Sequence, residues 1–498
     1  MNDVGGLQSL EAVLDAAGVG PVIEALLPTG GRPRQLPVRT LLLGMMLALV
    51  DHRPAHLTRV HRALVGLPEA ERRRLCVVVP WKSGPHLLTY RQTERTFSLV
   101  VNTLEGQDPE GTASDALAAV VDAMTEASVP ERWKKATTAL AVDWSDLESF
   151  ARGPLLAGGR TADSEATWGH RRGNGPGQKD ESFFGYYLQA ATMMNEEDGP
   201  PVPELARRIS VTACKHDPPK VFVGVLERMA ASGVAVGDVL ADSGYAHRLP
   251  EHWAVPLRQL GATLVQDLHP HDRGPKGTYF GATVSNGNLY CPATPAALLA
   301  IGPLARDATA EQTQAHDAQT AELGRYKLGA ITACDTDGYR RVGCPATQGK
   351  LRCPLRVASL SLSIEHPEVL SPPESPPPCC CQKTITVAPE VHAKTAQKHD
   401  YPSKAHRKSY ARRTGAERTF STAKDPATND ISRGWCRVMG TTAVTLFVAC
   451  LFVVRNERVV QAFEIRQADN QRRTAAGLAP RTRKRRRRPL AHLASSSP

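Results

Sequence analysis

The sequence predicts an α/β protein: a mixed sheet with helices, interrupted by an insertion and preceded by an all-helical N-terminal domain. Two observations along the 498 residues support this class. Apolar residues recur at three-and-four spacing, typical of amphipathic helices, as far as about residue 132, and from Thr137 they alternate, as they do in strands. Both periods are lost between about 267 and 400, and helical spacing returns from 401, which indicates an insertion.

Residues 1–132 are the expected helical domain. Each apolar segment has residues three and four positions apart, so that one face of a helix can be buried. Gly, Pro and Asp separate the segments, as expected between helices. The predicted helices are 7–18, 37–52, 54–67 and 89–106.

Residues 133–266 are expected to hold the first part of the sheet. Three alternating segments predict three strands, and an acidic Gly-Pro turn joins the second strand to the third. A helix, a strand, a second helix and a last strand follow, and this succession makes a mixed sheet. In chain order the predicted elements are strands 137–144, 182–194 and 204–217, helix 219–233, strand 238–242, helix 251–261 and strand 262–268.

Residues 267–400 are predicted to be a loop-rich insertion with the proline cluster SPPESPPP and seven of the eleven cysteines. The strands before it need covering helices, so we assign 401–470 to the second part of the same core. Its uncharged segment 438–454 has 17 residues, short of the roughly 20 that span a bilayer, and predicts a buried core helix. The basic, Ser-rich tail 471–498 is predicted to be disordered.

Composition and charge narrow the class of partner. Hydrophobic residues make up 41% and charged residues 22%, ordinary globular values that exclude wholesale disorder. Lys and Arg number 61 against 50 Asp and Glu, and the net charge of +11 favours a polyanionic partner such as nucleic acid or an anionic membrane. Seven of these positive charges lie in 481–488, and subtracting them leaves +4 for the rest of the chain. Dilute cysteines and an N-terminus without a signal-peptide pattern predict a reducing, cytoplasmic compartment.

Two aspartates come directly after apolar strands, Asp143 after TALAV and Asp242 after DVLA. A carboxylate at such a position points into the crevice beyond the sheet, where α/β folds bind their ligands. One such aspartate alone is more often a solvated turn residue. A functional site therefore requires further groups in the same place.

Tyr410, Arg413, Glu417 and Lys424 are such groups. At about 100° per residue they share an arc of about 60° on one helix face. A carboxylate beside two cations and a phenol suits a phosphodiester, because the acid can hold a metal while its neighbours grip phosphates. A solvated, salt-bridged face is the alternative. A T-x-x-E capping box beginning at Thr414 would also leave Tyr410 and Arg413 outside the helix.

Two strand-end aspartates followed by a glutamate in the spacing Y-x2-R-x3-E-x6-K resemble the DDE transposases of bacterial insertion sequences that carry the Y-R-E-K signature. The segments FFGYYLQAAT, VLADSGY and RTGAERTFSTAKD also resemble blocks of that family, as does the N-terminal PVRTLLLGMMLAL. The likeness spans roughly residues 35–460. It implies a ribonuclease-H-like core.

The resemblance also implies metal ions and a reaction. Three carboxylates of such a core hold two divalent ions, Mg²⁺ or Mn²⁺, about 3.5 to 4 Å apart. Water attacks one phosphodiester, and the freed DNA 3′-hydroxyl attacks a second. Carried over residue by residue, the catalytic metal ligands would be Asp143, Asp242 and Glu417, and the contacts to the transposon-end backbone would be Tyr410, Arg413 and Lys424.

The other parts of the chain receive roles from the same resemblance. Residues 1–132 would bind the terminal inverted repeats, the insertion would help to position DNA or a hairpin intermediate, and a homodimer would join two ends. The expected partner is double-stranded DNA, as terminal repeats and as target, with no membrane, in the cytoplasm at the nucleoid. Two other hypotheses are a catalytically inactive, transposase-derived DNA-binding protein and a related metal-dependent nuclease that cuts without strand transfer.

Two further sets of side chains leave alternatives open. Asp146 and Glu148 could take the place of Asp143 if the strand ends later, although Asp143 directly continues the apolar run. His269 and His271 could contact DNA or a metal, but a polar surface loop is the simpler interpretation.

The cysteines of the insertion raise the question of zinc. Structural zinc sites usually show C-x2-4-C pairs, which the insertion lacks outside the run Cys379–Cys381, so the sequence does not favour zinc. Cys-Pro nevertheless recurs at 291, 344 and 353, as in zinc knuckles.

Overall fold

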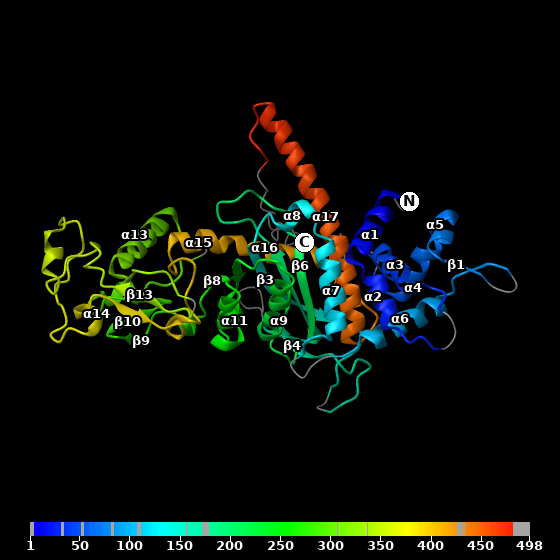
Figure 1. The fold of residues 1–498 in the computed structure, drawn as a ribbon, viewed down its shortest axis with the longest axis horizontal. Coiled ribbons are helices and arrows are strands. Elements are labelled where there is room, and N and C mark those ends of the chain that lie inside the picture. Colours follow the sequence, from blue (N-terminus) through cyan, green and yellow to red (C-terminus); the bar gives the residue numbers. More distant parts are fainter. Residues whose placement is uncertain are drawn as a thin grey trace, which may run out of the picture.

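A computed structural model shows a mixed α/β protein, with a helical region, a six-stranded mixed sheet and a lobe of short strands (Figure 1). The helical region and the lobe lie at opposite ends of the molecule, with the sheet between them. The structure describes residues 4–30, 34–50, 54–80, 84–106, 111–155, 158–171, 179–305, 307–335, 337–425, 431 and 434–481.

The N-terminal region is helical, and its four predicted helices are confirmed. α3 is its centre: most of its side chains are buried, because α1, α2, α4 and α6 surround it. α7 lies outside the predicted helices, and it packs against the sheet strand β6. The elements are α1 (Val4–Ala17), α2 (Val19–Leu26), α3 (Val38–Val50), α4 (Leu57–Val65), α5 (Glu69–Arg74), β1 (Val78–Val79), β2 (His86–Leu87), α6 (Tyr90–Leu104), α7 (Asp115–Ala127) and α8 (Glu131–Lys134).

The central sheet has the predicted succession of strands and helices. β3 pairs antiparallel with residues 185–193 of β5, while β4 and β6 pair end to end along the other edge of β5. On its far side β3 pairs with β7, and β7 with β8, both in parallel. β4 is an addition to the predicted strands. The elements are β3 (Leu140–Glu148), β4 (Thr167–Arg171), β5 (Glu181–Met193), β6 (Ala206–Ala213), α9 (Pro218–Ala231), β7 (Asp238–Ala241), α10 (Ser243–Ala246), α11 (Ala254–Gln259) and β8 (Thr263–Gln266).

The segment after the insertion returns to cover the sheet. It contains α15 (Lys404–Tyr410), α16 (Thr414–Ala423) and the long α17 (Thr441–Ala475). α16 packs on β3 and β5, whereas α17 packs on β6 and on α3 and α7 of the helical region.

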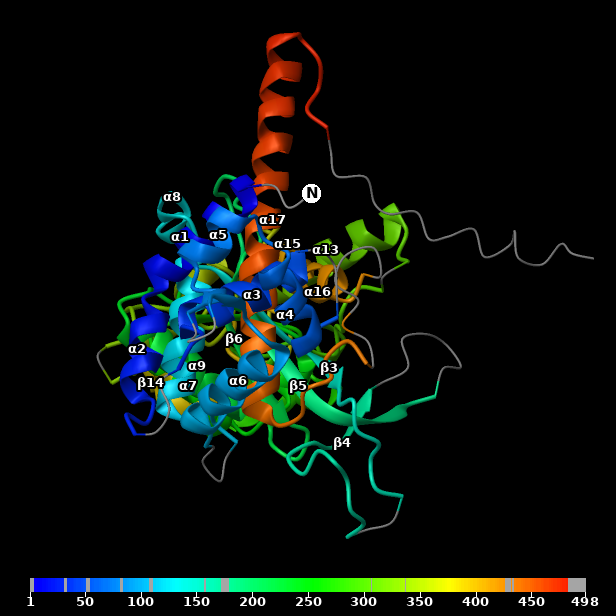
Figure 2. The same ribbon diagram turned by 90° about the vertical axis from the view of Figure 1, so that its right-hand side faces the viewer.

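α17 accounts for the apolar segment 438–454, and the prediction of a buried core helix is confirmed. Its side chains from Thr441 to Asn456 are buried, Phe463 still contacts Trp133, and the C-terminal end of the helix projects from the body of the protein (Figure 2). In the described part of the chain, no helix has the length and apolar character needed to cross a membrane. α17 continues to Ala475, so the first residues of the predicted tail are helical, and residues 482–498 lie outside the described residues.

The insertion is more ordered than predicted. It contains two three-stranded antiparallel sheets and a helix of 17 residues, α13, where only loops are expected from the sequence. α13 escapes prediction because it buries only Leu323 and Tyr326, so it has no apolar stripe. The elements are β9 (Pro275–Tyr279), β10 (Ala282–Ser285), β11 (Asn288–Tyr290), α12 (Ala296–Leu299), α13 (Ala310–Tyr326), β12 (Gly329–Ala330), β13 (Arg340–Gly343), α14 (Pro378–Cys381) and β14 (Ile385–Val387).

Candidate functional site

Alternation along β3 determines where Asp143 points. Ala139 and Ala141 are buried against Ala416 of α16, whereas Leu140 belongs to the core on the α9 side of the sheet. Asp143 is the next residue on the Ala139–Ala141 face, because side chains two positions apart in a strand share a face. Small alanine side chains let α16 approach this face closely.

Asp242 reaches the same place from β7. Leu240 of β7 pairs with Ala141 of β3 in a parallel register, so Asp143 and Asp242, each two residues further on, lie side by side where β7 ends. The Asp242 carboxylate then caps α10: it accepts hydrogen bonds from the backbone N–H groups of Gly244 at 2.9 Å and Tyr245 at 3.4 Å. The prediction that Asp143 ends its strand is wrong, because β3 continues to Glu148 along β5, whereas Asp242 does follow the last residue of β7.

The segment 404–423 is helical throughout, so the helix does not begin at Thr414, as a capping box there would require. α15 passes through a single 3₁₀ turn, Ala411–Arg413, into α16, and Tyr410 and Arg413 have right-handed helical backbone angles. The Thr414 hydroxyl donates to the carbonyl of Ala411 at 3.0 Å, so it forms no capping box with Glu417. Tyr410 and Arg413 therefore belong to the same helical path as Glu417.

Arg413 joins the three predicted acids. Its Nη2 lies 3.1 Å from Oδ2 of Asp143 and 3.6 Å from Oδ2 of Asp242, and its Nη1 lies 2.5 Å from Oε1 of Glu417. The Arg413 and Asp143 side chains are only 12% and 15% exposed, whereas Asp242 and Glu417 are 35% and 55% exposed. We call these four residues the carboxylate site. It is buried on the sheet side and open to solvent on the helix side.

The electrostatics follow from this burial. Burial is the main cause that raises the pKa of Asp143 to about 7, Arg413 opposes it, and the charges of Asp242 and Glu417 add to it. Burial alone would lower the pKa of Arg413, but Asp143 and the neighbouring acids outweigh it and the pKa lies above its usual value. Three acids at one position thus depend on a shared cation, which in this structure is a guanidinium.

Tyr410 lies beside the carboxylate site. Its ring stacks on that of His406, with centroids 5.7 Å apart and planes 12° apart. Burial is the first cause that raises the pKa of its phenol, and the charges of Asp267 and Asp242 contribute. The phenol therefore stays protonated and able to donate a hydrogen bond.

Lys424 is not at the carboxylate site. Its Nζ lies 2.7 Å from Oδ1 of Asp146, and Arg171 lies 2.8 Å from the other oxygen of that carboxylate. Arg171 also pairs with Glu148 at 2.6 Å. Asp146 and Glu148, the alternatives to Asp143, are thus neutralised in a separate group of ion pairs, and Asp143 is the acid of this strand that meets Asp242 and Glu417.

Three residues that the sequence did not indicate help to build the carboxylate site. The ring of Trp144 contacts that of Tyr245, with centroids 4.6 Å apart, and a side chain at Gly244 would come within 2.6 Å of Trp144. Tyr245 is fully buried, and among the described residues its hydroxyl has no hydrogen-bond partner. The glycine and tyrosine after Asp242 in the VLADSGY block are the available sequence signal.

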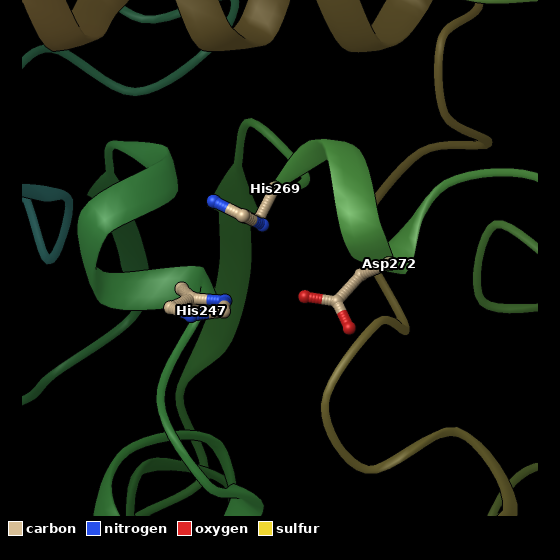
Figure 3. Close-up of side chains that lie close together, drawn as sticks. All are labelled: His247, His269 and Asp272. Carbon is tan, nitrogen blue, oxygen red and sulfur yellow. The ribbon is translucent and has the colours of Figure 1, made fainter.

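The histidines after β8 form a second group. Ligand atoms of His247, His269 and Asp272 lie within 4.8 Å of one another (Figure 3), and the rings of His247 and His269 have centroids 3.9 Å apart. Asp272 already pairs with Lys394 at 2.8 Å. His271 lies beside this group, with its ring 5.0 Å from that of His269. The predicted surface loop is a short 3₁₀ turn, Pro270–Asp272.

Comparisons with protein-family models, with curated proteins and with solved structures give no match for this chain. The functional argument therefore depends on the residues and their geometry.

Proposed function

We propose that the protein is a DNA transposase of the DDE type, which cuts DNA at the ends of an insertion sequence and joins the freed 3′-hydroxyl to target DNA. The observation that carries this proposal is the convergence of Asp143, Asp242 and Glu417 on Arg413. These acids come from three distant parts of the chain. Acids gathered beside a partly buried strand end oppose folding unless a cation neutralises them, so their presence suggests a function.

The sheet supports a ribonuclease-H-like core. Four antiparallel strands are followed by two parallel strands, with α9 before the first of these two and α11 before the second, and the insertion enters after β8. The first acid stands on β3 and the second follows β7. The third acid arrives on α16 after the insertion, in the order that the resemblance implies.

The donor set fits a pair of divalent cations. Asp143, Asp242 and Glu417 offer carboxylate oxygens only, the ligands that Mg²⁺ and Mn²⁺ prefer, and they already share a positive group. These three residues would hold the ions. When bound, such ions supply charge that stabilises the attacking and leaving oxygens of a phosphodiester.

The residues around the acids would position the DNA. Tyr410 keeps its proton and can donate to a phosphate oxygen, and Arg413 presents a guanidinium suited to the same anion. Lys424, now paired with Asp146, stands one helical turn or more beyond Glu417 and would contact the backbone further along the DNA. The basic residues of the tail would add affinity without sequence preference.

The remaining roles belong to the same proposal. The helical region, residues 1–132, would recognise the terminal inverted repeats, and the insertion would help to position DNA. Two copies of the chain would bring two ends together. The reaction would take place in the cytoplasm, at the nucleoid.

The test is a cleavage assay on a duplex that carries the terminal repeat of the element. Asp143→Ala, Asp242→Ala and Glu417→Ala should each lower Mg²⁺- or Mn²⁺-dependent nicking by about a thousandfold or more, because several kcal/mol of charge stabilisation is lost. DNA binding should remain within a few-fold of wild type. Asp146→Ala is the matched control, because it lies on the same strand with similar burial but belongs to the separate ion-pair group, and it should retain nicking.

Each outcome separates the hypotheses. Wild-type protein that binds the repeat but never nicks it in either metal would make it a DNA-binding protein. Nicking without joined products would make it a nuclease. Loss of nicking in Asp146→Ala together with full activity in Asp143→Ala would show that the catalytic acids are not those of the carboxylate site.

A further inference from the structure

Three Cys-Pro dipeptides of the insertion form the same turn. In each, the backbone N–H of the third residue after the cysteine donates to the cysteine carbonyl. The two threonines at this position also donate their hydroxyls to the same carbonyl, at 2.6 and 2.7 Å. The three turns are Cys291 to Thr294 (3.0 Å), Cys344 to Thr347 (3.1 Å) and Cys353 to Arg356 (2.9 Å).

The thiols of these turns gather at one place with a fourth. Cys291, Cys344 and Cys353 belong to one buried cluster with exposures of 5 to 6%, and Cys380 of α14 is 7% exposed. The Cys291 thiol is close enough to Cys344, Cys353 and Cys380 for charges on these residues to raise its pKa. Charges on Cys344 and Cys380 likewise raise the pKa of Cys353. We call these four residues the cysteine cluster.

Backbone donors point at two of the sulfurs. The N–H of Ala293 donates to Sγ of Cys291, and the N–H groups of Leu355 and Arg356 donate to Sγ of Cys353. Such N–H···S bonds favour a thiolate over a thiol. Burial nevertheless holds the pKa of Cys291 at about 12, so this sulfur stays protonated unless a positive charge joins the cluster.

The insertion has little else to hold it together. Its strands are two to five residues long, and its apolar side chains divide between two small clusters. Small units with little core commonly depend on a disulfide or a bound metal. All cysteines of the chain are free, so no disulfide supplies this stability.

We propose that Cys291, Cys344, Cys353 and Cys380 bind one structural zinc ion that stabilises the insertion. Four thiolates make a closed tetrahedral site of the structural kind, without an open position for catalysis. Three of these ligands come from separate turns and the fourth from a short helix, which explains why the sequence shows no C-x2-4-C pair. Cys379 and Cys380 are adjacent, with their sulfurs 3.9 Å apart, and both lie near Cys291; Cys380 is the fourth ligand because it also lies near Cys353.

Zinc binding would draw the four sulfurs together. In the part of the chain that the structure describes, only His247, His269 and Asp272 bring three candidate ligand atoms within 4.8 Å of one another. The four sulfurs therefore stand further apart than in a closed tetrahedral site. Metal binding and local folding are coupled in such sites, so closure upon binding is expected.

The first test is metal analysis of the full-length wild-type protein, purified without chelator. We expect about one zinc per chain and an X-ray absorption shell of sulfur at about 2.3 Å. A shell of nitrogen and oxygen at about 2.0–2.1 Å would overturn the proposal and indicate the His247 group instead. Absence of zinc from protein expressed in zinc-supplemented medium would overturn it as well.

Variants locate the ion. Serine in place of Cys291, Cys344, Cys353 or Cys380 should lower bound zinc to near zero. Cys334→Ser and Cys381→Ser alter exposed cysteines of the same insertion and should retain it, as should His269→Ala. Retention of zinc in all four cluster variants would refute the assignment.

A measurement on wild-type protein tests the same assignment without the risk that a variant fails to fold. A zinc chelator should release the ion and make four further thiols reactive towards a thiol reagent, whereas unchanged thiol reactivity on release would contradict the proposal. Neither result depends on Asp143, Asp242 or Glu417, so the zinc proposal and the transposase proposal can fail separately.

Discussion

The carboxylate site and the cysteine cluster both gather side chains from distant parts of the chain, but regular structure positions the first and turns position the second. Asp143 follows from strand alternation and Glu417 from helical spacing. The thiols stand on three Cys-Pro turns and a four-residue helix. The spacing of apolar residues predicts which side chains share one face of a helix or strand. A turn motif predicts only the backbone within that turn, and not which other turns lie near it.

The two regions also differ in how charge is balanced. The acids are ionisable groups beside a guanidinium that neutralises them within the protein. The thiols are neutral while they keep their protons, so they can gather without a cation. The carboxylate site should therefore be sensitive to the loss of a single positive side chain, and the cysteine cluster should not.

Replacement of that positive side chain is expected to have the largest effect on stability. Arg413→Gln leaves Asp143 partly buried without a cationic partner and should lower the free energy of unfolding by about 3–5 kcal/mol at pH 8 in the presence of a chelator. Addition of Mg²⁺ or Mn²⁺ should restore more stability to this variant than to wild type. Urea denaturation with and without metal measures both effects.

Arg171→Gln is the control for this prediction. Arg171 pairs with Asp146 and Glu148 but is 34% exposed, so its loss should cost about 1 kcal/mol or less and should not create a metal response. Equal losses in the two variants would mean that the acids of the carboxylate site need no shared cation.

What could be predicted from the sequence is the part of the carboxylate site that depends on regular strands and helices. That Asp143 and Asp242 follow apolar strand segments could be predicted from the sequence, but the continuation of β3 past Asp143 to Glu148 could not, because polar residues end the apolar run there. That Arg413 contacts all three acids could not, because the reach of a side chain between elements depends on how closely α16 packs on alanines. Lys424 shares the helix face of Glu417, yet its ammonium group pairs with Asp146. This contact could not be predicted, because it depends on where β3 runs after its pairing with β7 has ended.

The pH dependence of stability should also distinguish the carboxylate site. The folded protein keeps the Asp143 proton up to about pH 7, whereas the unfolded carboxyl loses it near its ordinary value of 3.8. The folded state binds more protons in this window, so the free energy of unfolding of metal-free protein should fall as pH rises from about 4 to 7 and then level off. The charges of Asp242 and Glu417, which face this carboxyl, raise its pKa, and that of Arg413 lowers it.

Asp143→Asn removes the titrating group and should flatten this part of the profile. Chemical denaturation at pH 5 and pH 8 compares wild type, Asp143→Asn and Asp146→Asn, of which the last should follow wild type. A wild-type profile that rises between these pH values relative to Asp143→Asn would show that the pKa of Asp143 is lowered rather than raised.

The smallest predicted effects concern two helix glycines, one in each region. A methyl group at Gly415 of α16 would come within 2.2 Å of the buried Met194 side chain, whereas one at Gly324 of α13 would meet no atom within 4 Å. Gly415→Ala should therefore cost about 1–3 kcal/mol, because tight packing has no room for the methyl group. Gly324→Ala should stabilise the insertion by about 0.4–1 kcal/mol, because alanine restricts the unfolded chain.

Thermal denaturation of both variants, with nicking as a second readout, measures these effects. Met194→Ala combined with Gly415→Ala should cost less than the sum of the two changes, because it removes the close contact that makes the methyl group unfavourable. Gly324→Ala should leave nicking unchanged. If Gly415→Ala instead stabilised the protein as much as Gly324→Ala, the close approach of α16 to the sheet would be refuted, and with it the packing that brings Glu417 to the two aspartates.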